Sequence, residues 1–106
     1  MTDLVFEGPI EGQPFLMLGA FDLAASGYVG EEWFASGAAG SYRQVGEMSD
    51  DGRWRASPAA SAAFRTRLVV RRPRDASAWN GTVVVEWLNV SGGLDAAPDW
   101  LFLHRH

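Results

Sequence analysis

The residues best suited to chemistry stand in a glycine-rich corner near the end of the sequence. Residues 81–93 begin at an Asn-Gly turn signal, continue through apolar and β-branched residues, and end in Ser91-Gly92-Gly93. Small residues let backbone N–H groups approach a ligand oxygen closely, which is what an oxyanion hole requires. Loop amides that have no functional role are common, so the position by itself leaves both interpretations open.

Two side chains near this corner resemble catalytic groups. Ser91 is not a nucleophile of the usual hydrolase kind, because the strand-to-helix elbow Gly-x-Ser-x-Gly is absent from all 106 residues. Glu86 interrupts an apolar stretch, where an ionised carboxylate needs a partner. We expect a structural ion pair between Glu86 and Arg67 or Arg71 rather than a catalytic role.

The histidines, the adjacent glutamates and the absence of cysteine and lysine argue against several kinds of catalytic and metal chemistry. His104 and His106 lie two residues apart on a predicted helix and point about 200° away from each other, so they cannot chelate one metal ion. Glu31 and Glu32 are adjacent in a predicted strand, so at most one can face a site, and we interpret them as solvated. The sequence has no cysteine and no lysine, which removes thiolate and Schiff-base chemistry. We predict no metal and no cofactor.

The composition is typical of one small soluble domain. Apolar residues make up 47% of the 106 residues, and none of their runs approaches the ~20 residues of a membrane span. No signal peptide is visible at the first residues, so we expect a cytoplasmic protein. Residues 1–53 carry nine acidic residues and two arginines, whereas residues 54–106 carry seven arginines and four acidic residues. The net charge of −4 opposes phosphate binding, so we predict neither nucleic acid nor membrane as a partner.

The elements that must position the corner follow from apolar patterning and breaker residues. Residues 1–26 are predicted to be an irregular leader, and residues 44–63 a connector. A strand is predicted at residues 28–37, and an alternating strand at 64–73. In the second strand one face carries Phe64, Thr66, Leu68 and Val70, and the opposite, wet face carries the arginines.

The segment at residues 82–89 is predicted to be the central strand, buried on both faces beneath covering helices. Acidic residues and a proline predict that a helix begins near Pro98. That helix has only about nine residues before the sequence stops, so we expect the chain to be truncated.

Several stretches resemble the N-terminal part of a bacterial family of alpha/beta hydrolase domain-containing proteins. They are residues 27–37, 64–73, 79–95 and 98–100. The resemblance implies an α/β fold of which residues 27–106 form the first strands and the start of the first helix, as a single incomplete domain. It also implies an oxyanion-hole loop at Asn89, Val90, Ser91 and Gly92. The catalytic nucleophile, acid and histidine would all lie beyond residue 106.

Two hypotheses of different kinds follow. In the first, the chain is the N-terminal portion of an esterase-like serine hydrolase that acts on a small ester or amide, and is inactive as the isolated 106 residues. In the second, it is a complete, β-rich, non-enzymatic binding or interaction module. A fragment should leave the sheet edge open, which would invite self-association, whereas a complete module should finish with a packed element.

Overall fold

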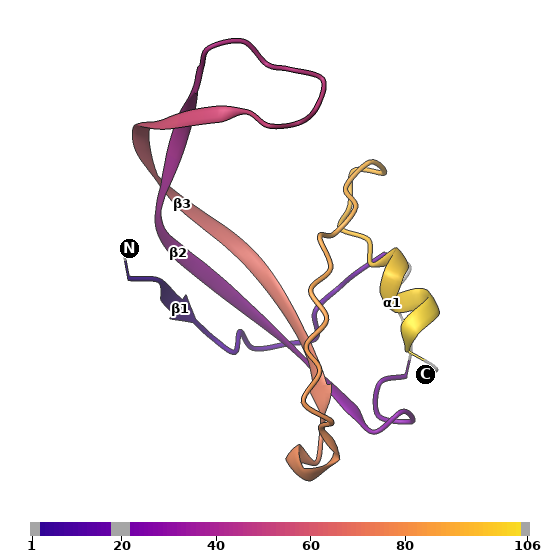
Figure 1. Ribbon diagram of the computed structural model, residues 1–106. Helices are drawn as coiled ribbons and strands as arrows, with labels where there is room; N and C mark the ends of the chain where they lie inside the picture. The colour runs from indigo at the N-terminus through magenta and orange to yellow at the C-terminus, as the bar shows by residue number, and fades with distance from the viewer. Residues whose placement is uncertain (1–2, 18–21, 105–106) are drawn as a thin grey trace. The chain divides into compact units, whose positions relative to one another are not determined.

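Strands account for most of the regular structure of this chain. The computed structural model describes residues 3–17 and 22–104. Its elements, in chain order, are β1 (Val5–Glu7), β2 (Tyr28–Val45), β3 (Arg55–Pro73), the 3-10 helix η1 (Ala76–Ala78) and α1 (Pro98–Leu103) (Figure 1). Helix α1 starts where the sequence predicts it, with Pro98 in its first turn. The described residues therefore form a sheet with one short α-helix.

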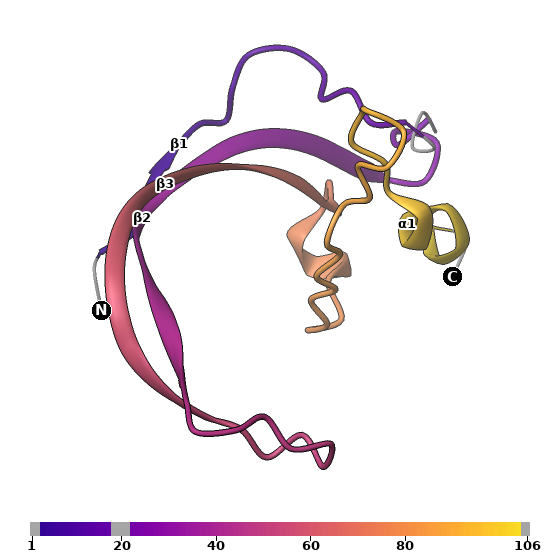
Figure 2. The ribbon, with the colours of Figure 1, turned by 90° about the horizontal axis from the view of Figure 1, so that it is seen from above.

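The three strands form one sheet in the order β1-β2-β3. β1 is antiparallel to β2, with Phe6 opposite Ala35, although residues 1–26 were predicted to be irregular. β2 and β3 lie side by side with opposite directions, as Figures 1 and 2 show. Their connecting loop contains two glycines with positive φ, Gly46 and Gly52, which allow a tight reversal.

The hairpin of β2 and β3 is longer than the sequence indicates. The strand predicted at residues 28–37 is confirmed, and β2 continues through the following glycines and alanines to Val45. The predicted connector at residues 44–63 is wrong in its second half, because β3 already begins at Arg55. Ladder hydrogen bonds use backbone groups, so an Ala- and Ser-rich stretch can pair without burying large side chains.

Phe64 is partly buried and Arg65 exposed, as predicted, but from residue 67 to residue 71 the more exposed face of β3 is the one predicted to be buried. Leu68 and Val70, expected to face inward, are 37% and 36% exposed. Arg67 and Arg71, expected on the wet face, are only partly exposed. For Arg71 the reason is a stacking contact, because its guanidinium carbon lies 4.9 Å from the ring centre of Trp100.

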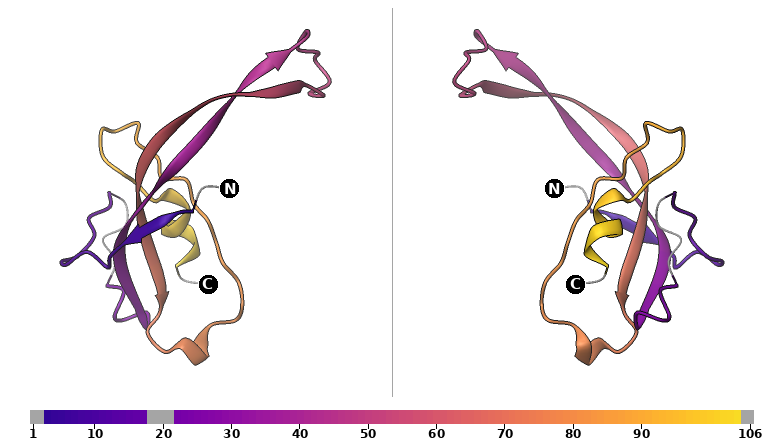
Figure 3. Two further views of the ribbon diagram at one scale, coloured as in Figure 1. Left: turned by 90° about the vertical axis from the view of Figure 1, so that its left-hand side faces the viewer. Right: turned by 90° about the vertical axis from the view of Figure 1, so that its right-hand side faces the viewer.

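The prediction of a buried central strand at residues 82–89 is wrong. Residues 82–88 have no strand structure and pair with no strand in the described part of the chain (Figure 3). Val85 is 90% exposed and Trp87 is 98% exposed. A segment that is apolar on both faces is buried only where strands flank it and other elements cover it. No described element does so here.

The chain divides into two compact units. The first contains residues 3–7 and 34–68, and the second contains residues 8–17, 22–33 and 69–104 among those described. In the first unit the buried core residue is Ala35, and Arg65 ties β3 to β1 through an ion pair with Glu7 at 2.5 Å. The same guanidinium lies 4.0 Å from the ring centre of Phe34. In the second unit the buried residues are Leu16, Ala96 and Ala97.

Candidate functional site

The predicted oxyanion loop lies entirely in the second unit and is closed at its base. Asn89 and Ala96 form an isolated antiparallel bridge. The amide of Asn89 donates to the carbonyl of Ala96 at 2.9 Å, and the amide of Ala96 donates back to the carbonyl of Asn89 at 2.8 Å. Residues 90–95 are therefore held as a closed loop, with all four predicted site residues on it or at its base.

Inside the loop, two amides are used to make the turn. The amide of Ser91 donates to Oδ1 of Asn89 at 3.0 Å, and the amide of Gly93 donates to the carbonyl of Val90 at 3.0 Å. Gly93 has a φ of 77°, which glycine adopts without strain. The amides of Val90 and Gly92 donate no hydrogen bond to any part of residues 3–17 and 22–104. All these loop residues are exposed.

A segment from early in the chain supports the base of the loop. The amide of Met17 donates to the carbonyl of Asp95 at 2.8 Å, and the amide of Ala97 donates to the carbonyl of Met17 at 3.3 Å. The loop also approaches the Met17 side chain, since a Cβ at Gly92 would lie 2.9 Å from the Met17 Cε. Ala96, on one side of the rung that closes the loop, is 2% exposed, whereas Asn89 on the other side is exposed.

Glu86 joins the entrance of the loop to the helix at its exit. Its Oε1 accepts a hydrogen bond from the amide of Asp99 at 2.8 Å, and its Oε2 accepts one from the amide of Trp100 at 3.2 Å. These amides lie in the first turn of α1, whose N-cap residue Ala97 supplies no side-chain hydrogen bond. Glu86 thus caps helix α1, although it lies 13 positions before Asp99 in the sequence.

Of the two arginines predicted to pair with Glu86, Arg71 interacts with it electrostatically. Burial lowers the pKa of the Arg71 guanidinium below its ordinary value, and the negative charge of Glu86 opposes that shift. Arg71 lies within electrostatic reach of Glu86 while it stacks on Trp100, whereas the hydrogen bonds described for the carboxylate come from α1. A helix as the partner carried no signal in the sequence, because the contact joins residues 13 and 14 positions apart.

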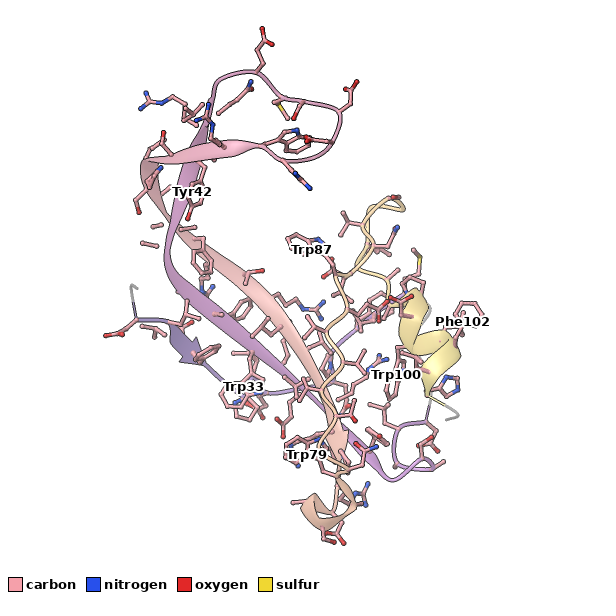
Figure 4. The ribbon with its side chains drawn as sticks, viewed as in Figure 1. Trp33, Tyr42, Trp79, Trp87, Trp100 and Phe102 are labelled. Carbon is pink, nitrogen blue, oxygen red and sulfur yellow. The ribbon has the colours of Figure 1, made fainter. Side chains whose placement is uncertain are left out.

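An aromatic cluster holds α1 in the second unit. The rings of Tyr28 and Trp100 meet edge to face with centroids 5.6 Å apart. Figure 4 shows Trp100 on α1, with Phe102 two residues further along the helix. Nδ1 of His104 lies 3.1 Å from the carbonyl oxygen of Trp100, which can only accept, so Nδ1 carries the proton in this contact. His106 lies outside the described residues.

The adjacent acids Glu31 and Glu32 were predicted to be solvated, but both are only partly exposed. Glu31 makes an ion pair with Arg72 at 2.5 Å and accepts a hydrogen bond from the indole of Trp33 at 3.3 Å. The Arg72 hydrogen bond, followed by that of Trp33, lowers the pKa of Glu31. The backbone carbonyl of Glu32 accepts from the amide of Ile10. Glu31 therefore has a structural role.

The described residues contain no group of three or more side chains that could hold a metal ion. None of their helices has the length and apolar character needed to cross a membrane.

An extended segment that enters a glycine corner and leaves it into a helix is how open α/β sheets build their ligand-binding loops. Residues 6–106 match the model of a family described as an alpha/beta hydrolase domain. Because the match covers nearly the whole chain, the chain belongs to this family, as its resemblance predicts. No curated protein sequence and no solved structure matches it.

Proposed function

We propose that this chain contributes the oxyanion-binding loop of an esterase-like serine hydrolase. The substrate class is a small ester or amide, and the nucleophile, the acid and the histidine come from residues outside these 106. The proposal is supported by membership of the alpha/beta hydrolase domain family. One observation carries the assignment of the loop: the amides of Val90 and Gly92 remain unused within the described residues, while the neighbouring amides form the turn.

The chemistry asked of this loop is electrostatic. When a serine attacks an ester carbonyl, the oxygen becomes an anion, and fixed N–H donors stabilise it more than they stabilise the neutral carbonyl. The turn hydrogen bonds of Ser91 and Gly93 fix the backbone between them, so no reorganisation is needed at the moment of reaction. Losing one such donor typically lowers kcat by about 10²–10³.

The first test is the coding sequence downstream of the His106 codon. A frame that continues and encodes Gly-x-Ser-x-Gly after a strand pattern supports the proposal, whereas a native stop codon at that point contradicts it. The 106-residue chain alone should not hydrolyse p-nitrophenyl acetate, because no residue in it is assigned as nucleophile.

The second test removes one donor from the protein encoded by the continuous frame. Val90→Pro eliminates an amide and keeps the carbonyl that accepts from Gly93. The matched variant Val90→Ala also removes the valine side chain beyond Cβ but keeps the amide. We expect kcat of Val90→Pro to fall about 10²–10³ below that of Val90→Ala, with KM little changed. Equal kcat values for the two variants would remove Val90 from the site.

A specific observation also favours the second candidate, an interaction module. Val83, Val84, Val85 and Trp87 are between 66% and 98% exposed, although they follow one another in an extended segment (Figure 4). Exposed apolar segments of this kind pair readily with another strand. In this candidate function the partner is a second copy of the chain, with residues 82–88 of the two copies paired.

A further inference from the structure

Glu86 occupies a special position relative to the loop, because its contacts span the loop completely. Its carboxylate meets the amides of Asp99 and Trp100, and the bridge between Asn89 and Ala96 lies between those two points along the chain. The loop is therefore held twice, by the backbone rung at its base and by a side-chain contact outside that rung. We name the Glu86 contact with the two amides the clasp.

Packing does not hold the entrance of the loop at this position. The residues on either side of Glu86 are Val85, which is 90% exposed, and Trp87, which is 98% exposed. Glu86 itself is partly buried. Since its neighbours bury almost nothing, the hydrogen bonds of its carboxylate are what fix this stretch against α1.

The negative charge of Glu86 interacts favourably with the first-turn amides of α1 and with Arg71. Backbone amides in the first turn of a helix are unsatisfied by the helix itself and carry partial positive charge. Arg71 adds a positive charge: burial lowers the pKa of its guanidinium, and the negative charge of Glu86 opposes that shift. A glutamine could accept from an amide, but it would offer one acceptor oxygen instead of two and no net charge.

We infer that Glu86 is a positioning residue that fixes the conformation of the oxyanion loop by clasping α1. It touches neither substrate nor reacting atoms and acts through the rung between Asn89 and Ala96. Its meaning for catalysis rests on the proposed function, but the clasp itself can be tested in the 106-residue chain without any hydrolysis.

The test compares amide hydrogen exchange in the 106-residue chain and in Glu86→Ala, Glu86→Gln and Glu47→Gln. Glu47 is an exposed acid in the hairpin loop of the first unit, so Glu47→Gln controls for the loss of one negative charge. In Glu86→Ala, exchange at the amides of Asn89 and Ala96 should accelerate by about tenfold or more. Losing a hydrogen bond to a charged group shifts the equilibrium between the closed and the open loop by about that factor. Glu86→Gln should fall between the wild type and Glu86→Ala, because it restores one acceptor.

A second readout is spectroscopic and reports on the two amides that donate to Glu86. The amides of Asp99 and Trp100 donate to the carboxylate oxygens of Glu86. Their proton resonances should therefore shift in both Glu86 variants and stay unchanged in Glu47→Gln. Unchanged exchange at Asn89 and Ala96 in Glu86→Ala would overturn the inference. So would equal acceleration in Glu86→Ala and Glu86→Gln together with unmoved Asp99 and Trp100 resonances.

The oxyanion assignment is tested separately from the clasp, by the Val90 variants. Should the Glu86 variants loosen the rung while Val90→Pro and Val90→Ala hydrolyse equally well, the clasp stands and the oxyanion assignment fails. If both hold, Glu86→Ala in the protein encoded by the continuous frame should lower kcat with little change in KM, and Glu86→Gln should recover part of it.

Discussion

Replacing Gly93 tests the backbone geometry on which the loop depends. Gly93 has a φ of 77° and donates its amide to the carbonyl of Val90. A Cβ built at this position meets no atom within 4 Å. Any penalty for Gly93→Ala therefore comes from the backbone conformation and not from a clash.

The magnitude follows from two opposing terms. A left-handed conformation costs an L-residue about 1–2 kcal/mol. Adding a Cβ also restricts the unfolded chain, which offsets about 0.4–1 kcal/mol of that cost. D-alanine at position 93 restricts the unfolded chain equally but suits a positive φ. The two variants should therefore differ by the strain alone, about 1–2 kcal/mol, which is a factor of about 5–30 in an equilibrium constant.

Hydrogen exchange at the Ala96 amide reports this difference, since that amide closes the loop and opens when the turn is lost. Exchange should be about 5–30 times faster with L-alanine than with D-alanine at position 93. As a second comparison, Gly92 does not have a positive φ, and a Cβ there would press on the flexible end of the Met17 side chain, so the effect of Gly92→Ala should be smaller. Equal exchange for the L- and D-alanine variants would refute the assignment of the turn.

Two further predictions concern other parts of the chain. The pKa of Glu31 is lowered in the folded state, first by its hydrogen bond with Arg72, so this contact stabilises the fold at pH values above the unfolded-state pKa of about 4.3 and is lost as the pH falls through the lower folded-state pKa. The stability difference between wild type and Glu31→Gln, measured by urea titration, should therefore shrink over that acidic range. A difference that does not change with pH would contradict the ion pair. If residues 82–88 pair between copies, sedimentation equilibrium should show concentration-dependent dimers that Val85→Lys weakens and Glu47→Lys does not, and equal dimerisation of both variants would exclude this segment as the interface.

The sequence located the loop but not the use of its amides. Asn89, Val90, Ser91 and Gly92 lie together, as expected, because they are consecutive and small residues favour a corner. Which amides make the turn depends on the Asn89 side chain turning back to Ser91, a choice of local geometry that residue types alone do not determine. The clasp was equally hidden, since it depends on where α1 lies relative to Glu86.

The errors about strands share one physical cause. Apolar character at residues 82–88 indicates what a segment would bury if it had neighbours, and burial itself requires those neighbours. Conversely, residues 55–63 looked weak because they have little to bury, yet the backbone of a hairpin pairs without it. Patterning therefore predicted Tyr28 and Pro98 as element starts correctly and failed where pairing, not composition, decides the structure.

The rung between Asn89 and Ala96 separates the framework of this loop from its tip. Outside the tip, Glu86 is hydrogen-bonded to α1 and Asp95 and Ala97 to Met17, whereas the exposed tip at Ser91 and Gly92 makes its described hydrogen bonds within the loop. Inserting a residue at the tip would change what the free amides face while the scaffold stays intact. Under the proposed function, loop length between the two ends of the rung is thus the variable through which evolution or design can adjust the preferred ligand.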